Sequence, residues 1–238
     1  VADMKKILIT GEHSYVGNAI EAYLKNYNEV AGRDCYLVDK ISLKNEGWKQ
    51  RSFAGYDTVL HVAGIAHADV EAVSEEEQKR YYAVNCELAK EAAQKACLDG
   101  VKQFVYFSSV IVYGDSAKVG KTKLVGADTV PTPANFYGDS KLQGEKAVLE
   151  LQTKDFGVAV LRLPMIYGKG SKGNFPVLVK LASKMPVFPD VKNQRSMIYV
   201  ENLAEFVRLL SEKQCRGMFY PQNAEYVTTI EMVRLIAM

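Results

Sequence analysis

A tyrosine and a lysine stand four positions apart in Tyr137–Lys141 (YGDSK), inside a segment with helical periodicity. Residues four apart share one face of a helix, so the phenol of Tyr137 and the ammonium of Lys141 can approach one ligand together. An unperturbed tyrosine, with a pKa of about 10, is a poor acid–base group at neutral pH, and a neighbouring positive charge favours its phenolate. The spacing therefore predicts proton transfer by Tyr137 with Lys141 as its cationic partner.

A second hydroxyl, that of Ser109, directly follows the apolar run Gln103–Ser108 (QFVYFS). A nearly continuous apolar run of this length is typical of a strand covered on both faces. Open parallel sheets bind their ligands beyond the carboxyl ends of such strands. We therefore expect Ser109 to orient the reacting oxygen of a substrate while Tyr137 moves the proton.

A glycine-containing turn, T-G-E-H-S-Y-V-G, connects the first predicted strand (Lys6–Thr10) to the first predicted helix (Tyr15–Asn26). A turn this tight requires a residue without a Cβ, and it directs backbone N–H groups and the start of the helix toward a pyrophosphate. The residues expected to hold a dinucleotide here are Gly11, Ser14, Tyr15, Val16 and Gly17.

The second predicted strand, Cys35–Asp39 (CYLVD), ends in an acidic residue. Asp39 is placed to accept hydrogen bonds from the adenosine ribose hydroxyls, which favours NAD. Arg33 and Lys40 flank it and are candidates for binding a 2′-phosphate, so NADP remains an alternative cofactor.

Strand and helix patterns alternate along the first two thirds of the chain, which predicts an α/β fold: a Rossmann doubly wound parallel sheet. The pattern changes after Pro164, where glycines and prolines divide the chain into short segments. We expect residues 1–163 to form the dinucleotide-binding domain and residues 164–238 a smaller substrate-binding lobe. The other expected elements are strands at Thr58–His61 and Val158–Leu163 and helices at Glu75–Leu98, Phe136–Lys154 and Val200–Ser211, the last packing back on the core.

The composition is that of an ordinary globular protein: 238 residues, 48% hydrophobic and 24% charged, with a net charge of +2. Such a balance provides no basic surface for nucleic acid. No apolar stretch is long enough to span a membrane and no signal-peptide pattern is present, so a cytoplasmic protein is expected. Four scattered cysteines and three unclustered histidines predict neither disulfides nor a metal site.

Taken in order, these motifs resemble the extended short-chain dehydrogenase/reductases, the NAD-dependent epimerase/dehydratases of nucleotide sugars. Further matching segments are His61–Gly64 (HVAG), Arg162–Pro164 with Tyr167–Gly168, and Arg195 with Tyr199–Val200. Ser14 departs from the family's G-x-x-G-x-x-G, where the middle glycine normally stands. By this resemblance the cofactor also contacts Ala63, Gly64, Asn85, Tyr137, Lys141 and Pro164, while Ser109, Asn174 and Arg195 contact the nucleotide sugar.

The resemblance is strongest to bacterial UDP-sugar 4-epimerases and 4-keto-reductases of surface polysaccharide pathways, which transfer hydride at sugar C4. A family dehydratase usually carries an acid/base pair after the serine position, and Val110 and Ile111 supply neither group. Epimerase and reductase both remain open, and a non-catalytic dinucleotide-binding regulatory protein is a remote alternative.

Two expectations concern the assembly. The resemblance implies a homodimer built from the long helices. Family members usually continue past the segment Tyr226–Ala237, so we expect the 238 residues to belong to a longer polypeptide.

Overall fold

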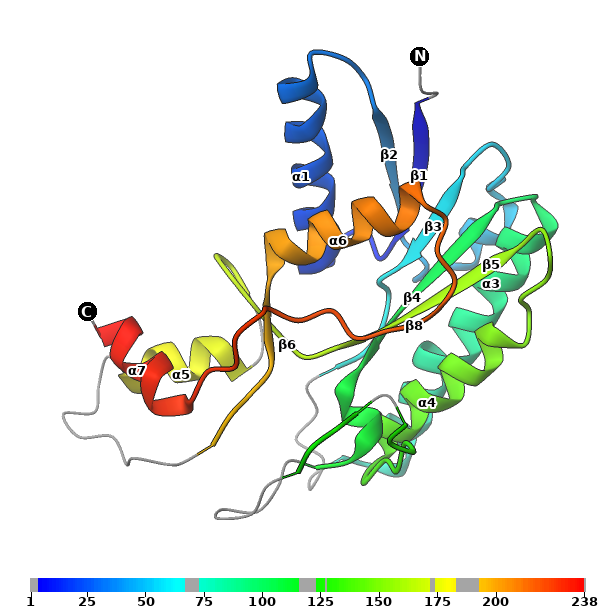
Figure 1. The fold of residues 1–238 in the computed structure, drawn as a ribbon. Helices are drawn as coiled ribbons and strands as arrows, with labels where there is room; N and C mark the ends of the chain where they lie inside the picture. The colour runs from blue at the N-terminus through cyan, green and yellow to red at the C-terminus, as the bar shows by residue number, and fades with distance from the viewer. Residues whose placement is uncertain are drawn as a thin grey trace.

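The computed structural model describes residues 4–66, 73–115, 123–126, 128–171, 174–182 and 193–237. Six parallel strands form the central sheet, in the order β2-β1-β3-β4-β5-β8 (Figure 1). Their bounds are β1 Lys5–Thr10, β2 Tyr36–Ile41, β3 Thr58–His61, β4 Gln103–Ser109, β5 Gly157–Leu163 and β8 Gly217–Phe219.

Helices cover both faces of this sheet. Helices α1 (Tyr15–Ala31) and α6 (Val200–Glu212) lie on one face, and α3 (Leu88–Leu98) and α4 (Phe136–Leu149) lie on the other (Figure 1). Each face has its own apolar core, centred on Ile7, Ile9 and Leu203 on the first and on Leu8, Phe104 and Ala92 on the second. The predicted doubly wound α/β fold is therefore confirmed.

The direction of winding reverses between β1 and β3. From β1 the chain moves outward to β2 and then crosses back to β3 on the other side of β1. The intervening residues 42–57 contain a short 3₁₀ helix, Glu46–Gln50, and no strand, so β2 forms the sheet edge. The crevice at such a reversal is where open α/β sheets bind ligands.

Two predicted helices differ from the structure in a way that matters for the site. The expected helix Glu75–Leu98 is made of α2 (Glu75–Tyr82), a π-helical turn (Ala83–Glu87) and α3. The expected helix Phe136–Lys154 ends earlier, at Leu149.

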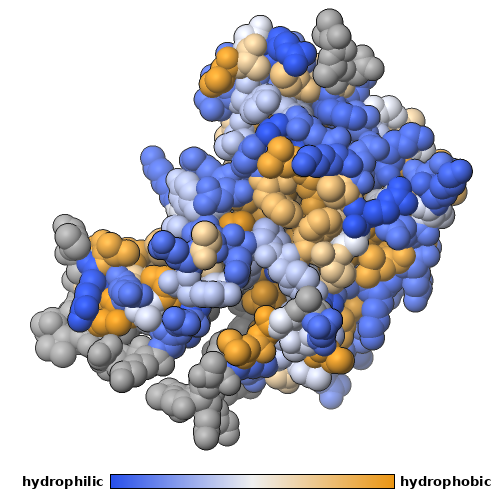
Figure 2. Space-filling model, viewed as in Figure 1, coloured by the Kyte–Doolittle hydropathy of each residue, from blue (hydrophilic) through white to orange (hydrophobic). Residues whose placement is uncertain are grey.

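The C-terminal part of the chain contributes to two structures. Strand β8 extends the main sheet, so the sheet of the expected dinucleotide-binding domain also contains residues beyond 163. A separate pair, β6 (Met165–Tyr167) and β7 (Met197–Tyr199), lies near the neighbouring helices α5 (Asn174–Ala182) and α7 (Thr229–Ala237). Figure 2 shows apolar side chains over α5 and α7, where Val177 and Leu235 are exposed. Within the described parts of the chain, no helix is both long and apolar enough to cross a membrane.

Candidate active site

The glycine turn after β1 lies at the winding reversal and is shaped to hold a ligand against the backbone. Gly11 has a φ of +97°, and a Cβ there would come within 3.0 Å of the backbone nitrogen of Ala63. At Gly17 a Cβ would meet Ile9 and Val62 at 3.1 and 3.2 Å. The first glycine permits the turn and the second lets α1 pack closely on β1 and on the loop after β3.

Ser14, the departure from the family loop, caps the helix. Its Oγ accepts a hydrogen bond from the Gly17 N–H at 3.3 Å, which satisfies one donor at the start of α1. The side chain of Tyr15 is turned toward the small lobe, since a Cβ on Gly168 would lie 3.0 Å from its hydroxyl. Serine at this position thus stabilises the loop in the absence of the usual glycine.

The structure places Asp39, the residue proposed to contact the adenosine ribose, inside β2 and not at its carboxyl end. Asp39 pairs with Leu8 and lies two positions before the end of β2, where its carboxylate accepts a 2.6 Å hydrogen bond from Tyr56. Ser42, which the sequence analysis did not single out, follows the pair Thr10–Ile41 and is therefore level with the glycine turn.

Neither basic candidate for a 2′-phosphate is free at the ligand edge. Lys40 is 2.6 Å from Glu21 and donates to Asn18 at 3.0 Å. Arg33 precedes β2, at the amino end of the sheet, opposite the edge where the glycine turn lies. Neither Arg33 nor Lys40 is therefore held in place to bind that phosphate by the described contacts.

β4 and α4 bring Ser109 next to Tyr137, close enough for the serine hydroxyl to lower the pKa of the phenol. Burial raises the pKa of Tyr137 to about 12, whereas the neighbouring Ser109 hydroxyl acts in the opposite direction. The Oγ of Ser109 also accepts from the Ile111 N–H at 3.3 Å, which fixes the serine at the start of the 3₁₀ turn Val110–Tyr113.

Lys141 is buried under the same edge, one helical turn from Tyr137. Its Nζ donates to the Phe107 carbonyl at 3.0 Å and lies 5.0 Å from the centre of the Tyr106 ring. A Cβ on Gly64 would be 2.9 Å from this Nζ, so any side chain there would press on the ammonium. Burial lowers the pKa of Lys141 to about 8, partly offset by Glu145.

Asn85 lies in the π-helical turn between α2 and α3 and joins three parts of the site. Its side chain accepts from the Ile65 N–H at 2.9 Å and donates to the Ile65 carbonyl at 3.0 Å and to Ser140 Oγ at 3.1 Å. Its backbone carbonyl accepts from the Tyr106 hydroxyl at 2.6 Å. Such turns are common at functional sites because the extra residue redirects a side chain.

Sequence reasoning missed two glycines of α4 that allow these elements to meet. A Cβ on Gly138 would lie 2.8 Å from the Ile111 carbonyl, and one on Gly144 would lie 2.2 Å from the Asn85 carbonyl. The signal that could have identified them is a glycine inside a helical pattern. Glycine disfavours the helix, so its presence there indicates a place where another element packs closely. Both place α4 against the turns that carry Ser109 and Asn85.

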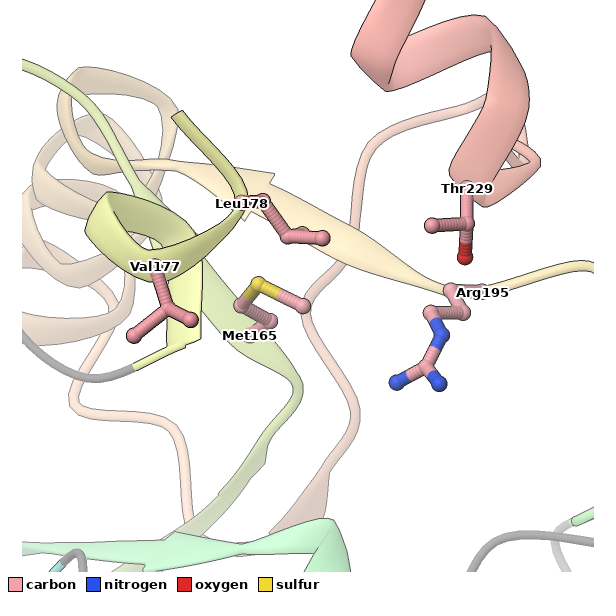
Figure 3. Close-up of a pocket in the computed structure, with 5 residues that line it drawn as sticks. All are labelled: Met165, Val177, Leu178, Arg195 and Thr229. Carbon is pink, nitrogen blue, oxygen red and sulfur yellow. The ribbon is translucent and has the colours of Figure 1, made fainter. Parts of the chain in front are cut away.

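The candidate substrate residues lie in the small lobe. Arg195 borders a pocket of about 220 Å³, together with Met165, Val177, Leu178 and Thr229. Its backbone pairs with Val227, and its exposed side chain lies across the pocket from Met165, Leu178 and Val177 (Figure 3). Asn174 begins α5, but its side chain falls outside the described part of the structure. Neither this pocket nor the larger one beside α7 is lined by Ser109, Tyr137 or Lys141.

Comparison with known proteins identifies the family. The NAD-dependent epimerase/dehydratase family matches residues 7–218. The chain belongs to this family. The resemblance stated from the motifs is thus confirmed, and with it a nicotinamide dinucleotide as the family's cofactor.

Individual relatives include both enzymes and a subunit of an enzyme. UDP-glucose 4-epimerase from Vibrio cholerae is 32% identical over 98% of this chain and 75% of its own length. Methionine adenosyltransferase 2 subunit beta from Xenopus tropicalis is 31% identical over 98% of this chain and 71% of its own length. Among solved structures, MoeE5 in complex with UDP-glucose and NAD has a TM-score of 0.76 at 20% identity, covering 98% of this chain and 81% of MoeE5.

The residues present fit a dinucleotide. Gly11 brings the turn after β1 against the backbone of Ala63, and the start of α1, whose N–H groups can hold a phosphate, lies at the same edge. The described residues contain no group of histidine, cysteine and acidic side chains arranged to hold a metal ion.

Proposed function

We propose that this family member is an NAD(P)-dependent 4-epimerase acting at C4 of a nucleotide-diphosphate sugar, either a UDP-hexose or a UDP-N-acetylhexosamine. The observation that carries the proposal is the placement of Ser109 next to Tyr137, with Lys141 buried one helical turn away on α4. The 32% identity to a UDP-glucose 4-epimerase supports the substrate class.

In the proposed reaction Tyr137 removes the proton from the C4 hydroxyl as that carbon becomes a ketone, and returns it when the ketone is reduced. Ser109 donates a hydrogen bond to the same oxygen and holds it beside the phenol. A nicotinamide dinucleotide held here would supply the hydride acceptor and donor for C4, with reduction on the opposite face of the sugar giving the epimer, and its positive charge would lower the pKa of Tyr137. Lys141 would hold the cofactor's ribose and add positive charge.

We assign the remaining binding roles residue by residue. Gly11, Ser14, Tyr15, Val16 and Gly17 hold the pyrophosphate, and Asp39 or the neighbouring Ser42 reads the adenosine ribose. Ala63, Gly64, Asn85 and Pro164 surround the rest of the cofactor, while Asn174 and Arg195 bind the substrate diphosphate. A cytoplasmic homodimer is proposed on the family resemblance.

The direct test is incubation of the purified protein with UDP-glucose, UDP-N-acetylglucosamine and their 4-keto derivatives, with and without added NAD(P)H. Formation of the C4 epimer without net consumption of the cofactor supports the epimerase. Consumption of one NAD(P)H for each 4-keto sugar identifies the protein as a 4-keto-reductase instead.

A role as a non-catalytic regulatory subunit is the second candidate, favoured by the 31% identity to methionine adenosyltransferase 2 subunit beta. It predicts that the protein binds the dinucleotide but converts none of these sugars. The paired Ser109 and Tyr137 favour catalysis, since binding alone does not require a phenol held against a serine.

A further inference from the structure

A buried ion pair lies beneath the candidate catalytic residues. Glu145 of α4 and Arg162 of β5 are 1% and 8% exposed. The Nε of Arg162 donates to both carboxylate oxygens at 3.1 and 3.2 Å, and its Nη2 donates to one of them at 2.7 Å. A pair held in this fork geometry has a fixed position and is shielded from solvent.

The pair holds both ends of the short segment that carries Ser109. Ser108 donates its hydroxyl proton to Glu145, and Arg162 Nη1 donates to the Tyr113 hydroxyl at 2.6 Å. The Tyr113 ring also lies 5.0 Å from the guanidinium carbon. Since Ser108 precedes Ser109 and Tyr113 ends the turn that Ser109 begins, a displaced ion pair displaces the serine.

The same carboxylate acts on Lys141, which lies one helical turn earlier on α4. The other groups that act on or contact this ammonium are His61 on β3 and the Tyr106 ring and Phe107 carbonyl on β4. Burial and Lys141 lower the pKa of His61 to about 3, so His61 is neutral. Among the described residues, Glu145 is the carboxylate whose charge favours the protonated lysine.

We propose that Glu145 and Arg162 form a positioning pair that fixes Ser109 and keeps the buried Lys141 protonated. The roles of Ser109 and Lys141 in this inference rest on the proposed function. Neither member of the pair is assigned a contact with substrate or cofactor; both act through their neighbours.

The test follows the titration of Lys141 directly, by NMR of the protein with ¹³Cε-labelled lysines, with the Lys141 signal assigned from Lys141→Met. Glu145→Gln should lower the Lys141 titration midpoint by about 1 pH unit or more, since an opposite charge nearby favours the charged form. Arg162→Lys keeps the charge but loses the fork and the Tyr113 contact. It should leave this midpoint within about 0.5 pH unit while kcat falls roughly 10-fold or more through the misplaced serine.

A matched control is available on the opposite face of the sheet. Arg208, 7% exposed, is held by the partly exposed Glu205 and Glu212, and Glu212→Gln weakens this arginine cluster far from the site. That variant should lose stability without altering kcat or the Lys141 midpoint.

If Glu145→Gln does not fold, the double variant Glu145→Gln/Arg162→Gln, which leaves no unpaired buried charge, is used to measure kcat. Its kcat should fall roughly 10-fold or more because the Ser109 segment loses both supports, and a wild-type kcat there overturns the positioning role. An unchanged Lys141 midpoint in the folded variant overturns the inference. Failure of the wild-type protein to convert any sugar overturns the proposed function alone, because the NMR titration does not depend on turnover.

Discussion

The two candidate acid–base groups are shifted in opposite directions by burial. The surroundings raise the pKa of Tyr137 to about 12 and lower that of Lys141 to about 8. The protein alone therefore holds the phenol protonated at neutral pH and keeps the ammonium close to losing its proton. Efficient proton transfer requires the pKa of Tyr137 to fall when the positively charged cofactor binds.

Replacing Tyr137 with Phe should reduce kcat by at least roughly 10²-fold, because it removes the group that exchanges the proton. The affinity for the dinucleotide should remain close to that of the wild type, since the phenol contributes mainly to the reaction. Steady-state kinetics and a cofactor titration measure the two effects. Tyr82→Phe is the control, since Tyr82 donates to Asp139 at 2.9 Å on the adjoining helix and takes no part in the reaction. A Tyr137→Phe protein with wild-type kcat contradicts the mechanism.

Replacing Lys141 with Met should stabilise the cofactor-free protein at pH 7. The fall in pKa from 10.5 to about 8 means that the charged lysine opposes folding by up to about 3 kcal/mol. Between pH 8 and 10.5 the unfolded chain holds a proton that the folded protein has released, so wild-type stability gains this amount as the pH rises. Denaturant unfolding at pH 7 and pH 10 should show the advantage of the variant at pH 7 and its loss at pH 10. Lys213→Met serves as an exposed control, and equal advantages at both pH values contradict the explanation.

Among the helices, α4 carries most of the site and is positioned by close approach. It supplies Tyr137 and Lys141 on one face, and its two glycines bring it against the π-helical turn and the turn after β4. At Gly144 a Cβ would lie 2.2 Å from the Asn85 carbonyl and 2.5 Å from the Tyr106 hydroxyl. Neither neighbour can move without breaking their mutual hydrogen bond at 2.6 Å.

Gly144→Ala should therefore destabilise the protein by about 1–3 kcal/mol, the usual cost of overpacking, although alanine is the better helix former. Thermal unfolding measures the loss. In Gly47→Ala the new Cβ meets only the Asn45 side chain, at 3.2 Å, so a small effect is expected there. A Gly144→Ala protein as stable as the wild type shows that α4 is free to shift.

The elements and the motifs on them were predictable because both depend on local sequence. Periodicity located β1 to β5 and the helices that cover them, but not the short elements β6, α5, β7 and β8 after Pro164. Spacing placed Tyr137 and Lys141 on one helical face. The π-helical turn at Asn85 was not predictable, since one extra residue inside a helix hardly disturbs its apolar pattern. The level of Asp39 along the sheet depends on strand register, and the Glu145–Arg162 pair depends on how β5 meets α4. Tertiary packing alone decides such features.

Across the molecule, the candidate chemistry and the candidate substrate binding belong to different parts of the chain. The carboxyl edge of the sheet holds Ser109, Tyr137 and Lys141, whereas the described pockets lie around β6, β7, α5 and α7. Arg195 is attached to this lobe by its backbone pairing with Val227 and makes no described contact with the catalytic residues. In the proposed function, this arrangement separates the candidate substrate-binding residue Arg195 from the candidate acid–base residues.

Replacing Arg195 with Ala should accordingly raise KM for the UDP-sugar by roughly 10-fold or more, the scale of a lost hydrogen bond to a charged group. The kcat should stay within about 3-fold of the wild type, since a contact with the diphosphate is equal in the ground and transition states. Steady-state kinetics on the same sugar separates the two constants. Arg216→Ala is the matched control, because Arg216 donates to the Thr153 and Lys154 carbonyls at the amino end of the sheet, away from the site. An unchanged KM removes Arg195 from the substrate site, and a fall in kcat at constant KM moves it to the reacting centre.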